Sequence, residues 1–197
     1  MSTRDRMLDA AAHVMRTRGL ARTTTKEIAK AAGYSEAALY KHFRDKTDLF
    51  LAVLVERAPT NLGSAVAGLT QRAGQGSVQE TLEQVARGAL AFYRVGFPMA
   101  ASLFAEPDLL AAHRAALRDR GAGPQYIGIA VAAYLTAERD LGRIRSDADP
   151  DAAAALLIGA CLQHAFLSSF AGEPADQDAT DQIATALVRT LMSGLNP

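Results

Sequence analysis

The sequence predicts an all-helical protein. Alanine supplies 41 of the 197 residues, whereas there are only seven Phe, five Tyr and no Trp, a composition that favours helices over aromatic-rich sheet cores. Apolar residues recur at i, i+3, i+4 and i+7, and no bounded run alternates with the period of two that a strand requires. Most prolines fall between these periodic segments, where they mark helix starts.

The elements follow in order from these signals. Leu8, Ala11, Ala12 and Met15 line one face of a first helix, and Gly19 provides a left-handed stop. Further helices are expected to begin near residues 24, 35, 47, 77, 107, 125, 150 and 176. The expected boundaries include Pro98, Pro107, Pro124, Pro150 and Pro174.

Three other segments carry specific expectations. Pro59 should end or kink the helix that precedes it, and RAGQGS at 72–77 should be a loop. The charge run from Glu138 to Arg145 predicts a solvated helix end. The 21 residues from Ala152 to Gly172 carry no formal charge, but their polar residues make a poor membrane span. We expect a helix covered on nearly every side by its own domain, with a second subunit as an open possibility.

The charges are balanced overall but unevenly distributed. There are 21 basic and 21 acidic residues, yet residues 1–48 carry a net charge of +4 and the remainder −4. This asymmetry favours contact between the first fifty residues and a polyanion, and the alternative is chance. The single Cys161 argues against a disulfide framework, and the charged start argues against a signal peptide. We therefore expect a cytoplasmic protein with no membrane partner.

Residues 23–49 contain the most informative motif. Thr24 followed by Glu27 predicts a capping box at the start of a short helix. Gly33 should end that helix, and Ser35 should cap the next one. Two short helices joined by about three residues form a helix-turn-helix unit, whose second helix lies in the DNA major groove.

The second helix separates apolar from polar residues. Leu39 and Phe43 should face the core, while a small, basic and aromatic face points outward. Lys41 can reach guanine or a phosphate, Tyr40 and His42 can donate to phosphates, and the preceding helix start offers a phosphate site. The expected DNA-binding residues are Thr24, Thr25, Ser35, Glu36, Ala37, Tyr40, Lys41, His42 and Lys46.

This stretch resembles the DNA-binding head of the TetR family of bacterial transcriptional regulators, over about 45 of the 197 residues. The matching residues are Gly19, Thr23 to Thr25, Ile28-Ala29, Ala32-Gly33-Tyr34-Ser35, Tyr40-Lys41-His42-Phe43, Lys46 and Leu49. The resemblance implies a homodimer with a divergent, helical ligand-binding body. Tyr34 departs from the small aliphatic residue usual in the family. Glu36 is a second departure, and it either reads a cytosine amino group or only favours the positive helix end.

The body has no catalytic motif. A wide apolar stripe from residue 78 onward, with neighbouring apolar residues, could line a ligand cavity, although core packing is the alternative for each residue. The candidate ligand-binding residues are Val85, Ala89, Phe92, Tyr93, Phe97, Phe104, Ile127, Val131 and Tyr134. The four histidines lack metal-ligand spacing, so we expect neither a metal nor a cofactor.

The sequence therefore predicts a helix-turn-helix domain at 1–48 and a helical ligand-binding and dimerisation domain at 49–197. The expected function is a repressor, released from a palindromic DNA operator by a small apolar or amphipathic molecule and dimerised through its two C-terminal helices. Ligand binding should move the 47–58 segment. Two alternatives stay open: a helical binding module without DNA binding, and an all-helical enzyme.

Overall fold

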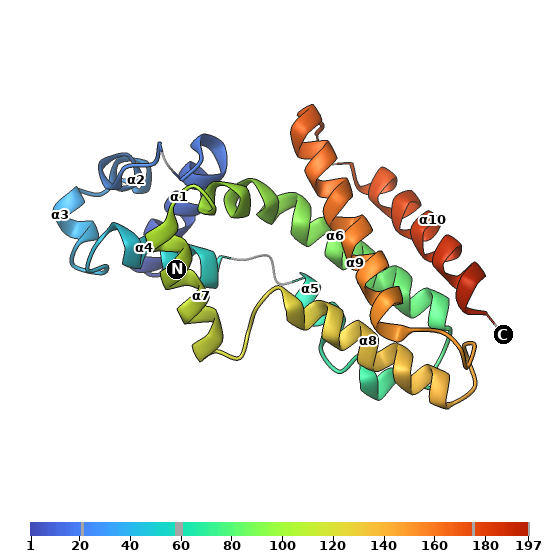
Figure 1. Cartoon of the computed structure of the whole chain (residues 1–197). Helices are drawn as coiled ribbons and strands as arrows, with labels where there is room; N and C mark the ends of the chain where they lie inside the picture. The colour runs from blue at the N-terminus through green and yellow to red at the C-terminus, as the bar shows by residue number, and fades with distance from the viewer. Residues whose placement is uncertain (21, 58–60, 175, 197) are drawn as a thin grey trace. The chain divides into compact units, whose positions relative to one another are not determined.

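The computed structural model describes residues 1–20, 22–57, 61–174 and 176–196. Every regular element in these ranges is helical, which confirms the predicted fold class (Figure 1). The helices are α1 (Thr3–Arg18), α2 (Thr25–Ala32), α3 (Glu36–Leu39), α4 (Lys46–Glu56), α5 (Asn61–Val66), the 3-10 helix η1 (Thr70–Arg72), α6 (Val78–Leu103), α7 (Pro107–Asp119), α8 (Gln125–Asp140), α9 (Pro150–Ala171) and α10 (Gln177–Leu195).

The chain packs as two compact units. The head unit comprises Met1–Ala58 with Gly96–Gly123, and the body unit comprises Pro59–Val95 with Pro124–Pro197. Packing therefore does not divide the chain at the boundary between residues 48 and 49. Leu49, Phe50 and Val53 of α4 are buried in the same core as α1, and α7 packs on α4. The functional division at 48/49 stays a prediction.

The core of the head unit is built on α1. Its predicted apolar face is confirmed, since Leu8, Ala11, Ala12 and Met15 are all buried. Ile28 and Ala29 of α2 join the same cluster, together with Leu39 of α3. The short helices α2 and α3 bury too few residues to be stable alone, so α1 and α4 supply the apolar surface that holds them.

Local capping accounts for the helix boundaries. Predicted and observed starts agree closely at Lys46, Val78, Pro107, Gln125, Pro150 and Gln177. Asp149 and Asp176 cap α9 and α10 by accepting hydrogen bonds from amides of the first turn. Gly172 ends α9 in the left-handed conformation at φ 68°, where an L side chain would be strained. The loop expected at 72–77 begins one residue later, because Arg72 is the last residue of η1.

The expectation for Pro98 was wrong. It lies inside α6, a single helix over Val78–Leu103. Proline removes one backbone hydrogen bond of the helix. Met99 and Leu103 beyond it are buried, and we attribute the continuation of the helix to their burial. Pro59 lies outside the described residues; the preceding α4 ends at Glu56.

The prediction that the charge run at the end of α8 is solvated was wrong for Glu138. Glu138 is fully buried: its carboxylate accepts from the Gly74 amide at 3.2 Å and lies 3.4 Å from Arg143 Nε. Arg143 also donates to the Gly76 carbonyl. These contacts fasten the 73–77 loop to α8. A buried carboxylate is stable only with such partners, and the sequence gives no sign of contacts between residues about 65 positions apart.

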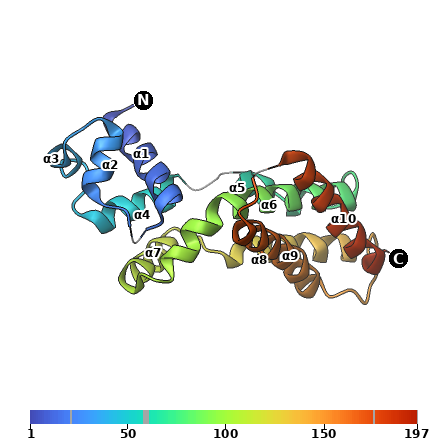
Figure 2. The ribbon, with the colours of Figure 1, turned by 90° about the horizontal axis from the view of Figure 1, so that it is seen from above.

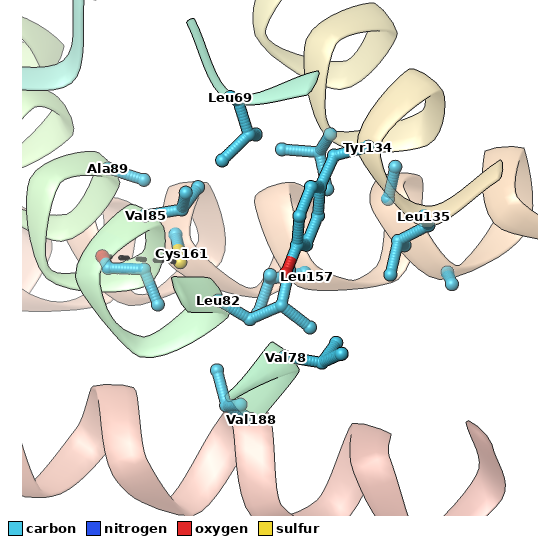
Figure 3. Close-up of a cluster of buried hydrophobic side chains, with 14 of the residues drawn as sticks. Leu69, Val78, Leu82, Val85, Ala89, Tyr134, Leu135, Leu157, Cys161 and Val188 are labelled. Carbon is cyan, nitrogen blue, oxygen red and sulfur yellow. Dashed lines mark hydrogen bonds between the residues drawn. The ribbon is translucent and has the colours of Figure 1, made fainter. Parts of the chain in front are cut away.

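The body unit packs α6, α8, α9 and α10 around one apolar cluster. Figure 3 shows Tyr134 reaching from α8 toward Leu82 of α6 and Leu157 of α9. Burial raises the pKa of Tyr134 to about 12. Helices α8 and α10 each contact α9 (Figures 1 and 2), and α8 also contacts α5 and η1.

Helix α9 is covered on one face only. By length and composition it could cross a membrane: its most apolar stretch of 18 residues has a mean hydropathy of 1.6, and 33% of that stretch is buried inside the protein. Ala153, Leu157 and Cys161 are buried, whereas Leu156 and Phe170 are 68% and 83% exposed. The expectation of cover on nearly every side is therefore not met within a single chain.

Candidate nucleic-acid interface

The helix-turn-helix geometry follows from its capping residues. Thr24 Oγ1 accepts from the Glu27 amide at 3.2 Å, and Glu27 Oε2 accepts from the Thr24 amide at 3.2 Å, so the predicted capping box is present. Gly33 ends α2 at φ 78°, and Ser35 Oγ accepts from the Ala38 amide at 3.2 Å. These bonds fix the turn between α2 and α3.

The residues around α3 divide into two faces, as the pattern predicts. Leu39 and Phe43 are buried in the head core, and Tyr40, Lys41 and His42 are exposed. Helix α3 itself is short, since it ends at Leu39 and the chain continues as a turn. Lys41 therefore projects from the turn after α3 and not from the helix body.

The predicted DNA-binding residues lie on α2, on α3 and the residues next to each, and, in the case of Lys46, at the start of α4. The exposed members are Thr24, Ser35, Ala37, Tyr40, Lys41, His42 and Lys46, while Glu36 is half-buried and Thr25 is buried. Nothing in the structure tests their contact with DNA. Lys26 is exposed in the first turn of α2 but is not among the predicted DNA-binding residues. Its position next to Thr25 in the sequence could have indicated it.

Two basic residues at this surface are held by neighbours. The Arg44 guanidinium forms an ion pair with the Asp48 carboxylate at 3.0 Å. The hydrogen bond in this pair holds the pKa of Asp48 below its usual value. The Lys46 ammonium lies 5.0 Å from the centre of the Phe50 ring, a cation–π contact that orients it. Among the described residues, neither Lys41 nor Lys46 forms an ion pair with a carboxylate, so both charges are available to an anion.

The two departures from the family pattern each have a partner in the structure. The Arg6 guanidinium lies 5.2 Å from the centre of the Tyr34 ring, so the aromatic residue gains a cation–π contact with α1. Glu36 Oε1 accepts from the Thr25 hydroxyl at 2.5 Å. This bond across the two helices is a role for Glu36 that the sequence did not suggest.

A set of ion pairs joins α4 to α1. Arg57 lies 3.0 Å from Asp5 and 2.7 Å from Asp9, and Arg4 forms a two-pronged pair with Glu56 at 2.6 and 2.7 Å. Sequence analysis missed these pairs because their members lie about 50 residues apart. Pairs this close to the surface each contribute little to stability, because water screens them. Together these ion pairs hold the C-terminal end of α4 against α1.

The comparisons with known families agree with this geometry. Residues 7–53 match the family described as bacterial regulatory proteins, tetR family, and residues 113–194 match the C-terminal domain of AefR-like transcriptional repressors. The chain belongs to the TetR family. This is a family of DNA-binding transcriptional regulators and not of enzymes.

Individual relatives cover different parts of this TetR-family chain. The regulator AcrR of Shigella flexneri is 43% identical over 61 residues, which is 31% of this chain and 28% of AcrR. The chain thus matches less than a third of that relative's length. A crystal structure described as a TetR-family regulator from Mesorhizobium loti has a TM-score of 0.75 at 23% identity, covering 99% of this chain and 97% of that one. FadR of Bacillus subtilis with stearoyl-CoA has a TM-score of 0.67 at 17% identity, covering 96% and 98%. These two structures establish the fold.

The candidate ligand-binding residues are distributed over both units. Val85, Ala89, Val131 and Tyr134 are fully buried in the body core, and Phe92, Tyr93 and Ile127 pack half-buried against it. Figure 3 shows Val85 and Ala89 on the same side of this cluster as Cys161. Phe97 and Phe104 belong to the head unit, and Phe104 is 70% exposed. In this conformation the seven candidate residues of the body unit are part of its packed core.

Proposed function

We propose that this TetR-family chain is a ligand-responsive, sequence-specific repressor, released from a palindromic operator by a small apolar or amphipathic molecule. The observation that carries the DNA-binding part is the capped α2–α3 unit, with Lys41 and Lys46 exposed near one another in sequence and Leu39 and Phe43 anchoring the opposite face. This is the arrangement that a helix-turn-helix uses to enter a major groove.

The body unit supports the ligand-binding part. Its core is apolar and joins α6 to α8 and α9, and a similar fold in FadR of Bacillus subtilis was solved with stearoyl-CoA. A ligand entering this core must stabilise a second, expanded arrangement of the helices. DNA affinity then falls only by as much as the ligand's affinities for the two arrangements differ.

Dimerisation is proposed through α9 and α10. The exposed side of α9 combines small residues with large apolar ones: Ala152, Ala155, Gly159, Leu156, Leu162, Leu167 and Phe170. Contiguous apolar surface of this kind is unusual on a monomer. A second copy would cover it by the same face, as a two-fold interface requires. We place the protein in the bacterial cytoplasm, where its operator DNA lies.

The proposed DNA binding is tested by selecting bound duplexes from a random pool. We expect an enriched palindrome or near-palindrome whose half-sites lie about 34–36 Å apart, or a multiple of that distance. Affinity for it should fall steeply with salt. Recovery of no enriched sequence at low salt would contradict the proposal.

A further inference from the structure

Three side chains of the head unit form a chain of hydrogen bonds beside α3. The Thr25 hydroxyl lies 2.5 Å from Glu36 Oε1, and the Tyr40 hydroxyl lies 3.3 Å from Thr25 Oγ1. Thr25 is buried and Glu36 half-buried, whereas Tyr40 is 46% exposed. The buried Thr25 hydroxyl therefore lies between two side chains, Glu36 and Tyr40, that are both in part open to solvent.

The direction of each bond follows from the number of hydrogens available. An ionised glutamate can only accept, so the single hydroxyl hydrogen of Thr25 is donated to Glu36. Thr25 Oγ1 can then only accept from Tyr40, which commits the single phenol hydrogen of Tyr40. The Tyr40 oxygen consequently presents only lone pairs to the outside.

An oxygen that only accepts has a restricted set of partners on DNA. Phosphate oxygens are acceptors, so they cannot bond to Tyr40 in this arrangement. In the major groove the donors are the amino groups of adenine N6 and cytosine N4. The negative charge of Glu36 close to the surface also disfavours the approach of a phosphate.

We infer that Tyr40 reads an adenine or cytosine amino group, and that Glu36 is a positioning residue that makes Tyr40 an acceptor through Thr25. The inference rests on the proposed DNA-binding function. It replaces the expectation that Tyr40 donates to a phosphate. It also gives Glu36 an indirect part in sequence preference, in place of a base contact of its own.

The test compares Thr25→Val and Tyr40→Phe with the parent protein by selection from the random pool. Valine keeps the shape of Thr25 and leaves Glu36 charged, but it releases the Tyr40 hydrogen. Tyr40→Phe should lose the preference for an amino-bearing base at one position of each half-site, by about 2- to 10-fold, the range of one net hydrogen bond. Thr25→Val should relax the preference at the same position, because the freed Tyr40 hydroxyl can then either donate or accept. Thermal melting identifies a variant that has lost its fold.

A change on the DNA supplies the matched control. Replacing the base at that position by its analogue without the amino group should weaken the parent protein by the same factor and leave Tyr40→Phe unaffected. Glu36→Gln, which removes the charge but keeps an amide oxygen for Thr25, should retain the preference.

Each contrary outcome has a separate meaning. If the parent enriches a site but Tyr40→Phe weakens all sequences equally, Tyr40 contacts a phosphate and the inference is wrong. If Glu36→Gln alone changes the preference, Glu36 reads the base directly, which also overturns the inference. If the parent enriches no sequence, the proposed function itself fails.

Discussion

At the scale of single residues, Lys41 and Lys46 of the head should play different parts. Lys41 follows α3 directly, whereas Lys46 is held over the Phe50 ring at the start of α4. Lys41→Ala should relax sequence preference if Lys41 reaches a base, with a loss of ~1–3 kcal/mol at one position. Binding assays on matched and mismatched duplexes measure this loss.

Lys46→Ala should instead weaken all duplexes alike. Its loss should reduce the slope of log affinity against log salt by about one unit, because one phosphate contact disappears. If the two variants change sequence preference and salt slope in the same way, the prediction of different roles for Lys41 and Lys46 is wrong.

Asp5 provides a prediction about pH. Its hydrogen bonds with Ser2, and then with Arg57, lower the pKa of this carboxyl from 3.8 to about 2. A carboxyl whose pKa is lower in the folded state stabilises the fold above its unfolded pKa, and that contribution is lost as the pH falls toward 2. The difference in unfolding free energy between the parent and Asp5→Asn should therefore be constant above about pH 5 and shrink toward pH 2.

Urea unfolding followed by circular dichroism at pH 6 and pH 2.5 measures this difference. Asp119→Asn, an exposed aspartate outside the ion pairs found among the described residues, serves as the control. A difference for Asp5→Asn that persists unchanged to pH 2 would show that Asp5 acts only through its shape.

At the scale of elements, the exposed face of α9 makes the sharpest prediction. Leu156 is 68% exposed in the single chain, so Leu156→Arg should leave the subunit folded. In the proposed dimer the same change buries an unpaired charge and should give monomers. Leu187 is a poorer choice because it packs against the body core, where a charge would also damage the fold.

Sedimentation measures this effect, and Ile129→Arg on α8 is the matched control. Ile129 is 55% exposed, so it receives the same charge on a comparable apolar site outside α9 and α10. We expect the control to remain dimeric. A Leu156→Arg variant that also stays dimeric would place the interface elsewhere.

Most helices could be predicted from the sequence because their signals are local. Capping residues, proline at a first turn and a periodic apolar face each act within a few residues of one another, as at Thr24, Pro150 and α1. The failures involve contacts that are distant in sequence. Pro98 continues α6, Glu138 is buried against the Gly74 amide, and Arg57 pairs with Asp5.

The candidate site was predictable to the same extent. The family motif places Tyr40 and Lys41 on the outward side, and the structure has them exposed. The sequence could not reveal that Thr25 is buried between Glu36 and Tyr40, because this depends on how α2 and α3 pack. The ligand region was less predictable still, since core and cavity residues share the same apolar pattern.

At the scale of the whole molecule, an effector should couple the body to operator affinity. With stearoyl-CoA as the probe, as in the proposed function, a compound that binds the body should lower operator affinity about 5- to 150-fold. The measurement is operator affinity against compound concentration. A compound that saturates the body without changing that affinity is not the effector.

Filling the body core should block this response. Ala89 is fully buried, so Ala89→Phe overpacks the core at a cost of ~1–3 kcal/mol and leaves less room for a ligand. Operator binding should persist, because the proposed DNA-binding residues lie in the head unit. Ala133→Phe, at an exposed position of α8, should keep the response. Equal behaviour of the two variants would place the ligand outside this core.

The one-sided cover of α9 bears on the fate of each newly made subunit. A single chain carries Leu156, Leu167 and Phe170 in contact with water, and in the proposed dimer a second copy covers them. Exposed apolar surface of this kind is what chaperones and proteases act on. With the proposed dimer, solitary subunits would be cleared faster than assembled ones. The cellular level of the regulator would then depend on its rate of synthesis more steeply than in simple proportion.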